Sequence, residues 1–329
     1  MTKKIIIVDL DGTVIFSDML QENALSLLSI KPFEIFKIPF YLYKGKAFLK
    51  KKLASLIAID VSNLPYNQDF LIWLNDQKDQ GSRLVLCTGS DEIHAKKIAD
   101  FLGIFDEVLA SDGQVNLVGK KKAEKLVNLY GYKNFDYAGN SKKDIHIWKE
   151  SKNAIVINSS KSLINCVRKF TNISFSLPKK KIYFKNIFKA MRVHQWLKNL
   201  LLFAPLVAAH QIDDLSAWHS VIIGFMSFSF CASAIYILND LTDLSNDRAH
   251  HSKKNRPFAA AKLSYLFGII LIPVLLIVSF AIAIFFSTIE FVFWLALYLF
   301  LTTLYTFFLK QIILLDVITL AMLFTIRII

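Results

Sequence analysis

Two groups of acidic residues in this sequence have spacings suited to phosphate chemistry. The first is Asp9-Leu10-Asp11-Gly12-Thr13, where two carboxylates stand two residues apart just after the apolar run Ile5–Val8. One carboxylate can attack a phosphoryl group while the other gives and takes the proton. Both also offer the hard oxygen ligands that Mg²⁺ takes. The pattern predicts Asp9 and Asp11 as catalytic residues and as metal ligands.

Three later positions are expected to complete this first site. Thr88 can donate its hydroxyl to a phosphate, and Asp144, shortly after Gly139-Asn140-Ser141, can add a carboxylate to the metal site. A lysine of Gly119-Lys120-Lys121-Lys122 can balance the negative charge, and the Gly-x-x-Lys-Ala spacing favours Lys122 over its two lysine neighbours. Because these elements follow successive strands in order, a catalytic group is favoured over unrelated turns and helix caps.

The segments that carry these residues alternate between strand and helix. Short apolar runs end in polar turns and are separated by helical stretches, which predicts an α/β Rossmann-like domain with a parallel sheet. Reactive side chains gather at the carboxyl ends of such strands, so the polar residues above are expected to meet there. The expected strands are residues 5–8, 83–87, 107–109, 136–138 and 154–157.

Residues 14–73 interrupt this alternation with helical sequence and are expected to form a cap inserted after the first strand. The apolar, basic part of the cap, residues 33–52, either belongs to the cap core or rests on a membrane surface. The lack of a sustained amphipathic period favours the cap core. The expected domain limits are 1–170 for the soluble domain, 171–190 for a basic linker and 191–329 for a membrane domain.

The second acidic group is Asn239-Asp240-x-x-Asp243-x-x-x-Asp247-Arg248. On one helix these carboxylates share a face, where they would repel each other unless a cation lay between them. Mg²⁺ bridging to a diphosphate supplies that charge. The pattern therefore predicts metal ligands and, beside them, groups that bind substrate phosphates. The metal ligands are Asp240, Asp243 and Asp247, and the substrate-binding residues are Asn239, Arg248, Lys253 and Arg256.

The second half of the chain has the composition of a membrane protein. The sequence is 54% hydrophobic, and apolar runs of spanning length dominate from Trp196 onward. Segments rich in Lys and Arg precede the first apolar run and follow the second. By the positive-inside rule, this charge distribution predicts that the Asp-rich loop and residues 1–170 lie on the cytosolic side of the inner membrane. Five spans are expected, at residues 196–210, 217–238, 263–287, 291–309 and 312–329.

Charge and cysteine content exclude other classes of protein. The net charge is +13, but many basic residues lie just before the first span, where an anionic leaflet attracts them. No nucleic-acid module is recognisable, so nucleic-acid binding is not expected. Three cysteines without a close motif exclude a disulfide framework, and the N-terminus is not a signal peptide. Protein partners are not indicated by the sequence.

Over residues 1–170 these motifs resemble the haloacid-dehalogenase-like (HAD) superfamily of phosphohydrolases. The match rests on residues 9–13, Thr88, Lys122 and residues 139–144. The resemblance implies a HAD-like fold with a helical cap and a Mg²⁺ cofactor. In that superfamily the first Asp of the motif, here Asp9, is the nucleophile, and an Asp at the position of Asp11 is typical of phosphatases. The sequence departs from the family at Asn140, where many members carry an acid.

Residues 190–329 resemble the UbiA-type intramembrane prenyltransferase superfamily, whose first Asp-rich motif binds Mg²⁺ and a polyprenyl diphosphate. The branch of decaprenyl-phosphate phosphoribosyltransferase-like proteins is the most similar, and residues 192–199 are the most specific part of the match. The branch also shares Phe203-Ala204-Pro205, Lys253-x-x-Arg256-Pro257, Leu309-Lys310 and Leu315-Asp316-Val317. The resemblance implies four further substrate-binding residues, which are Lys198, Asn199, Lys310 and Asp316.

This resemblance implies a transferase that moves a phosphoribosyl group from phosphoribosyl diphosphate to a polyprenyl phosphate, fused to a Mg²⁺-dependent phosphatase. One alternative is transfer of a polyprenyl group from its diphosphate to an aromatic acceptor. Another is a non-enzymatic membrane scaffold or transporter with a phosphate-sensing domain. The superfamily usually has about nine spans, whereas this sequence ends inside the fifth expected span, which indicates either a fragment or a truncated reading frame.

Overall fold

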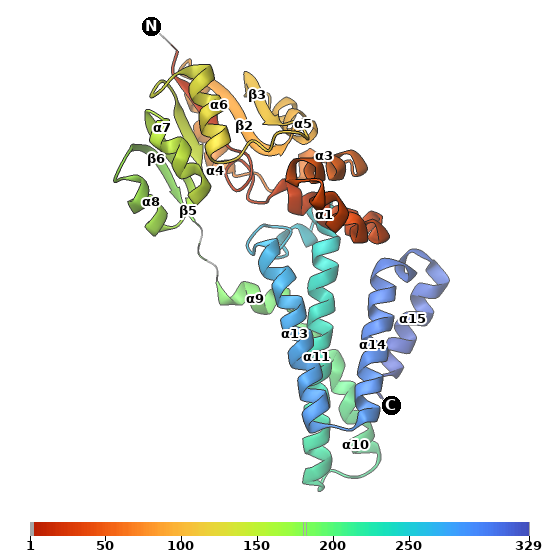
Figure 1. The fold of residues 1–329 in the computed structure, drawn as a ribbon. Coiled ribbons are helices and arrows are strands. Elements are labelled where there is room, and N and C mark those ends of the chain that lie inside the picture. The colour runs from red at the N-terminus through yellow and green to blue at the C-terminus, as the bar shows by residue number, and fades with distance from the viewer. Residues whose placement is uncertain (1–2, 180, 182, 329) are drawn as a thin grey trace. The chain divides into compact units, whose positions relative to one another are not determined.

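The computed structural model describes residues 3–179, 181 and 183–328 and shows two units in the chain. The first unit is Met1–Lys181 and the second is Ile182–Ile329. Strands and helices alternate in the first unit, whereas the described part of the second is entirely helical (Figure 1).

The first unit is built on a parallel sheet of six strands in the order β3-β2-β1-β4-β5-β6. Successive side chains of a strand point to opposite faces. Ile6 and Val8 of β1 accordingly enter one apolar core, whereas Ile7 enters the other. The strands are β1 (Ile5–Val8), β2 (Arg83–Asp91), β3 (Glu107–Ser111), β4 (Asp136–Gly139), β5 (Asn153–Ser159) and β6 (Asn172–Pro178).

Helices cover both faces of this sheet (Figure 1). Residues of α4 (Gln68–Asp79) and α5 (Glu92–Leu102) complete one core. Residues of α6 (Lys120–Tyr130), α7 (Ile145–Glu150) and α8 (Lys161–Val167) complete the other. The predicted α/β fold, with a parallel sheet and helices on both faces, is confirmed.

The sixth strand corrects the predicted linker. Residues 171–190 were expected to be a basic connection, but β6 pairs with β5 and belongs to the sheet. Its apolar residues Ile173, Phe175 and Leu177 alternate with polar ones, which is the period of a strand. The ring of Phe175 stacks on Trp73 with centroids 4.6 Å apart. The later part of the same segment forms α9 (Phe184–Ala190) in the second unit.

A helical cap follows β1 and has an apolar core of its own. It consists of α1 (Met19–Ile30), the 3₁₀ turn η1 (Pro32–Lys37), α2 (Ile38–Tyr43) and α3 (Lys46–Leu56). The cap is shorter than the predicted 14–73, because Phe70 and Leu74 of α4 pack in the core of the sheet. The buried residues of the cap core are Leu27, Tyr41, Leu49, Leu53 and Ile57.

His94 of α5 joins the sheet domain to the cap, because its Nε2 lies 2.9 Å from Asn23 Oδ1 of α1. The ring is buried, and desolvation lowers the pKa of His94 to about 4. The unfolded chain therefore binds this proton more tightly than the folded one, and stability is lost as the pH falls from about 6.5 toward about 4. We expect a loss of about 3 kcal/mol over that range.

Denaturant unfolding of the first unit within the intact chain, followed by pulse proteolysis at several pH values, measures this effect. His94→Gln should remove most of the acid sensitivity, whereas His146→Gln, at an exposed ring, should not. Equal pH profiles for the wild type and His94→Gln would contradict the assignment.

Three helices of the second unit are, among the described residues, long and apolar enough to cross a membrane. They are α11 (Leu215–Thr242), α13 (Tyr265–Phe286) and α14 (Ile289–Phe307), and they agree with the second, third and fourth predicted spans. α13 packs along α11, and α14 contacts both. Ser227 of α11 and Ser279 of α13 each donate a hydroxyl to the other's carbonyl, at 2.8 and 2.7 Å. Such small polar residues let membrane helices approach closely.

The first and fifth predicted spans take other forms. Residues 196–210 contain the end of a 3₁₀ helix, η4 (Val193–Phe203), and a short helix, α10 (Ala204–Ala208). Pro205 lies in the first turn of α10, and its missing N–H group interrupts a helix arriving from η4. The fifth is α15 (Ile313–Thr325), an apolar helix of 13 residues. The expected number of five spans is not confirmed.

Candidate functional site

Asp9 and Lys122 form the centre of the first site. Asp9 follows β1 directly, and Lys122 in the first turn of α6 donates from Nζ to Asp9 Oδ1 at 2.8 Å. The same ammonium group donates to the Cys87 carbonyl at 2.9 Å and to the Tyr137 hydroxyl at 3.1 Å. Of the three candidate lysines, Lys122 is the buried one, and its two neighbours are exposed. The structure thus brings the predicted nucleophile and the predicted cation into contact.

Asp11 lies at the same edge and is held by two donors. The Ser90 hydroxyl donates to Asp11 Oδ2 at 2.6 Å, and the Met19 backbone N–H, at the start of the cap, donates to Oδ1 at 2.9 Å. Desolvation, together with the negative charges of Asp18 and Asp9, raises the pKa of Asp11 to about 7. A carboxyl group with this pKa can both give and accept a proton at neutral pH.

Asp144 is fixed by the loop that follows β4. Its Oδ2 accepts from the backbone N–H groups of Asn140 and Ser141, at 3.1 and 2.9 Å, and from the Ser141 hydroxyl at 2.9 Å. Its Oδ1 accepts from the Tyr137 hydroxyl at 3.1 Å. Tyr137 therefore links Asp144 to Lys122, a connection that spacing in the sequence does not indicate.

The C-terminal part of β2 holds the predicted Thr88 and is contacted by one residue that the sequence analysis missed. Thr88 is buried, and its Oγ1 accepts from the Ser90 backbone N–H at 3.0 Å. Lys50 of the cap helix α3 donates from Nζ to the Gly89 carbonyl at 2.6 Å and to Asn116 Oδ1 at 3.0 Å. The cap thus brings a second ammonium group to the end of β2, next to Thr88. Nothing in the sequence marks Lys50, because it lies in a lysine-rich helix 39 residues before its partner.

Gly12 allows the chain to turn beside these carboxylates. Its φ is +72°, and an added Cβ would lie 1.9 Å from Asn140 Nδ2. Gly81 is a matched control, since its φ is +85° and an added Cβ would meet nothing within 4 Å. We expect alanine at either position to lower the free energy of unfolding by about 1–2 kcal/mol through the left-handed backbone. Only Gly12→Ala should also reduce phosphate release, because Asn140 must move. Equal phosphate release by the two variants would contradict this role for Gly12.

The donor chemistry of the first site fits Mg²⁺, although no metal cluster is preformed. Asp9, Asp11 and Asp144 are carboxylates at one sheet edge, and their charges influence one another. Among the described residues, however, no three acid, imidazole or thiol groups converge closely enough to hold a metal ion. The three predicted ligands therefore do not form one cluster, because their carboxylate oxygens accept hydrogen bonds from backbone amides, hydroxyl groups and Lys122. Asp9 and Asp144 are the residues that would hold the ion, which would neutralise phosphate charge.

A second cluster lies at the C-terminal end of α11, where two arginines converge on buried acids. Arg192 donates from Nη2 to Asp240 Oδ1, and Arg256 Nη1 lies 3.2 Å from the same oxygen. Arg256 Nη1 also donates to both oxygens of Asp247, at 2.9 and 2.7 Å. Asp240 and Asp247 are each only 2% exposed. Arg256 thus bridges the two carboxylates, and it is the cation that compensates the buried charge of Asp247.

The predicted single helical face of carboxylates is wrong. α11 ends at Thr242, and Asp243 is the junction to a separate short helix, α12 (Leu244–Ala249). Asp243 pairs with Lys310 Nζ at 3.0 Å, and this ammonium group also lies 3.5 Å from Asn239 Oδ1. Asp243 is therefore paired with Lys310, whereas Asp240 and Asp247 share Arg256. In the described part of this unit they do not form a metal site either.

The remaining predicted substrate-binding residues are dispersed. Asn199 is buried and donates to the Ser229 hydroxyl at 2.9 Å, whereas Lys198 is exposed. Arg248 donates to the Ala259 carbonyl and to the Tyr265 hydroxyl. Lys253 is exposed in η5 (Lys253–Asn255), three residues before Arg256. Asp316 accepts from the Tyr305 hydroxyl at 2.7 Å and is not among the partners of Arg192 or Arg256 in the described residues. Arg192, which the sequence analysis used only as part of a motif, is the additional member of this site.

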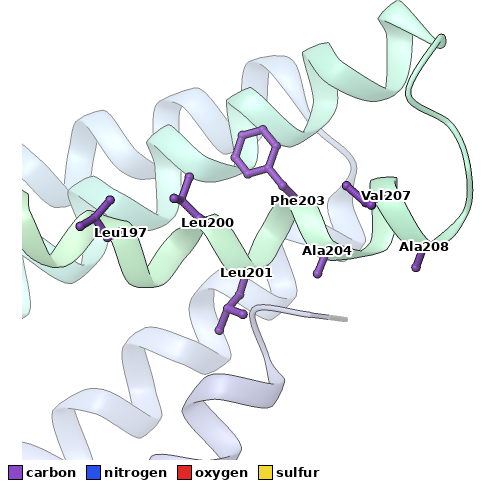
Figure 2. Close-up of a pocket in the computed structure, with 7 residues that line it drawn as sticks. All are labelled: Leu197, Leu200, Leu201, Phe203, Ala204, Val207 and Ala208. Atoms are coloured by element: carbon purple, nitrogen blue, oxygen red, sulfur yellow. The ribbon is translucent and has the colours of Figure 1, made fainter.

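An apolar hollow runs along η4 and α10 in the second unit. Figure 2 shows its lining side chains, all of which are hydrocarbon. Without an ionisable group it cannot do acid–base or phosphate chemistry, and its composition suits contact with acyl chains. The lining residues are Leu197, Leu200, Leu201, Phe203, Ala204, Val207 and Ala208.

Comparisons with known proteins match this division of the chain. Residues 200–329 match the UbiA prenyltransferase family. The uncharacterised protein y4nM of Sinorhizobium fredii is 33% identical over 325 residues, which are 98% of this chain and 63% of that protein. A decaprenyl-phosphate phosphoribosyltransferase of Mycolicibacterium smegmatis is 44% identical over 80 residues, which are 22% of this chain and 24% of that enzyme. The chain thus spans less than two thirds of the length of these relatives.

Among solved structures, a substrate-bound phosphoserine phosphatase is 17% identical with a TM-score of 0.37, and the match covers 57% of this chain and 98% of that one. The fold of the first unit is established by its own strand order and by the helices on both faces. Residues 200–329 match the UbiA prenyltransferase family, and in the same chain they follow an α/β domain built on a parallel sheet of six strands.

Proposed function

We propose that the second unit transfers a phosphoribosyl group from phosphoribosyl diphosphate to a polyprenyl phosphate, and that the first unit is a Mg²⁺-dependent phosphatase. The observation that carries the transferase is the cluster in which Arg192 and Arg256 meet at Asp240. The choice of substrates is supported by the name of the relative from Mycolicibacterium smegmatis. The observation that carries the phosphatase is the contact of Lys122 with Asp9, beside Asp11.

In the transferase reaction, the bond from ribosyl C1 to the diphosphate oxygen breaks, and a bond from C1 to an oxygen of the lipid phosphate forms. Diphosphate leaves with the electron pair of the broken bond. Arginine forks bind phosphate oxygens in bidentate fashion, so Arg192 and Arg256 are the groups we assign to the diphosphate. Lys310, which pairs with Asp243, adds a further positive charge.

In the phosphatase reaction, an Asp9 oxygen attacks phosphorus, the bond to the ester oxygen breaks, and Asp11 gives that oxygen its proton. Water then attacks the aspartyl phosphate, Asp11 takes a proton from the water, and inorganic phosphate and free Asp9 result. Lys122 stabilises the carboxylate of Asp9 between turnovers. Magnesium, when bound, would neutralise the phosphate oxygens.

The two activities would act in sequence on one lipid. The transferase product carries a phosphomonoester on its ribose, which is the kind of group a phosphatase removes. Fusion in one chain keeps the second site at a high effective concentration for the product of the first. The positive-inside pattern supports placing the Asp-rich loop and the first unit on the cytosolic side.

The main alternative is transfer of a polyprenyl group to an aromatic acceptor, which the name of the matched family favours. Intact protein in nanodiscs, supplied in parallel with labelled phosphoribosyl diphosphate and labelled polyprenyl diphosphate, separates the two. Label from the first donor in a polyprenyl-phosphate product is the expected result. Label only from the second, in an aromatic product, would replace the proposal.

Asp243→Asn separates an enzyme from a membrane scaffold or transporter. We expect this variant to lose at least about 100-fold in transfer rate, because the charge that orders Lys310 and Asn239 is gone. Asp213→Asn is the control, since Asp213 is exposed in the same unit. Unchanged transfer by Asp243→Asn would favour the non-enzymatic interpretation.

A further inference from the structure

The cap of the first unit exposes aromatic side chains that its own core does not use. Phe33, Phe36, Phe40 and Tyr43 are 72%, 78%, 59% and 90% exposed. They belong to η1 and α2, whereas the cap core is filled by other residues, among them Tyr41. Four rings this exposed within eleven residues are costly in water and mark a surface that contacts something apolar. We call these four residues the aromatic cap face.

Lysines flank the aromatic cap face along the sequence. Residues 31–52 contain seven lysines and a single acid, Glu34. Lys31 and Lys44 are exposed, and Lys44 Nζ lies 4.9 Å from the ring centroid of Phe40. Lysine stems can lie along apolar surface while their ammonium groups reach anionic headgroups. Aromatic rings, for their part, favour the boundary between headgroups and acyl chains.

From these observations we propose that the aromatic cap face docks on an anionic lipid bilayer. Lipid is favoured over a protein partner because the charge is one-sided and the exposed rings belong to two short consecutive helices. The chain is also anchored in a bilayer by α11, α13 and α14, so lipid is always at high effective concentration. Docking would fix the orientation of the cap, whose Lys50 and Met19 contact the first site.

A fluorescent label on the full chain in nanodiscs tests this docking. Cys87 and Cys231 are buried, so a Cys166→Ser background leaves one engineered thiol for an environment-sensitive fluorophore. Phe36→Cys and, separately, Tyr43→Cys carry the label on the aromatic cap face. Tyr132→Cys is the matched control, at an aromatic residue that is 61% exposed outside the cap.

In discs of phosphatidylcholine and phosphatidylglycerol, both cap labels should show blue-shifted emission that a doxyl-labelled lipid quenches, whereas the control label should not. Lys44→Gln should lower the docking equilibrium about fivefold in these discs. Discs of phosphatidylcholine alone should also weaken the quenching.

Three outcomes would overturn the proposal. Cap labels as exposed to water as the control label would mean that the face is not docked. Blue-shifted labels that the doxyl lipid does not quench, in discs and in detergent alike, would mean that protein covers it. If that shift disappeared on dilution in detergent, the cover would be a second copy of the chain.

Discussion

Asp9→Asn should abolish phosphate release by the intact chain, with a fall in rate on the order of 10⁴-fold or more. The amide cannot attack phosphorus as a carboxylate does, and it cannot hold the charge of Lys122, which lies 2.8 Å away and is buried. Burial alone would lower the pKa of Lys122, but Asp9 and neighbouring negative groups outweigh it and raise that pKa. The lysine therefore remains charged throughout the neutral range.

The measurement is release of inorganic phosphate from p-nitrophenyl phosphate and phosphosugars in the presence of Mg²⁺. Asp100→Asn is the matched control, because Asp100 is an exposed carboxylate on α5. Since loss of a buried partner for Lys122 can also unfold the unit, the thermal transition of each variant is recorded alongside. Retained phosphate release by a folded Asp9→Asn protein would exclude Asp9 as the nucleophile.

Arg256→Met should destabilise the second unit by about 3 kcal/mol or more, because it leaves Asp247 buried without its cation. Arg256 contacts both oxygens of Asp247 and one oxygen of Asp240. Asp240 keeps Arg192, so most of the cost is expected to arise at Asp247. Transferase activity should be lost as well.

A double-mutant cycle in detergent separates this ion pair from general packing. Asp247→Asn combined with Arg256→Met should cost clearly less than the sum of the single changes, since no unpaired charge remains. Lys253→Met is the matched control, because it removes a positive charge from an exposed side chain three residues earlier. Additive effects of the two changes, or an equal loss in Lys253→Met, would contradict the bridging role of Arg256.

Much of the first unit could be predicted from local patterns. The apolar runs identified β1 to β5, and the polar residues after them meet at one edge because parallel strands share a direction. The sixth strand was not predicted, because the lysines that follow it indicated a basic linker. Ile173, Phe175 and Leu177 nevertheless alternate with polar residues, as in a strand. The face on which a side chain of a single strand or helix lies can be predicted from the sequence, because it depends only on the period of that element.

Contacts between distant segments could not be predicted in the same way. Lys50 reaches Gly89 from the cap, and Lys310 reaches Asp243 from 67 residues away, so no local period encodes either pair. The Asp-rich segment shows the same limit. Helical spacing predicted a common face for its acids, but the chain leaves the helix at Asp243. Asp243 pairs with Lys310, whereas Asp240 and Asp247 share Arg256. The positions of these carboxylates thus depend on their tertiary ion-pair partners rather than on local helix propensity.

The most direct test of the account is to trap the phosphoryl group on the protein. The intact chain is mixed with ³²P-labelled acetyl phosphate and Mg²⁺, quenched in acid, digested and analysed by peptide mass spectrometry. We expect one acid-stable, hydroxylamine-sensitive acyl phosphate on Asp9, which should be absent from Asp9→Asn. Steady phosphate release without any labelled peptide, or with the label on another residue, would contradict it.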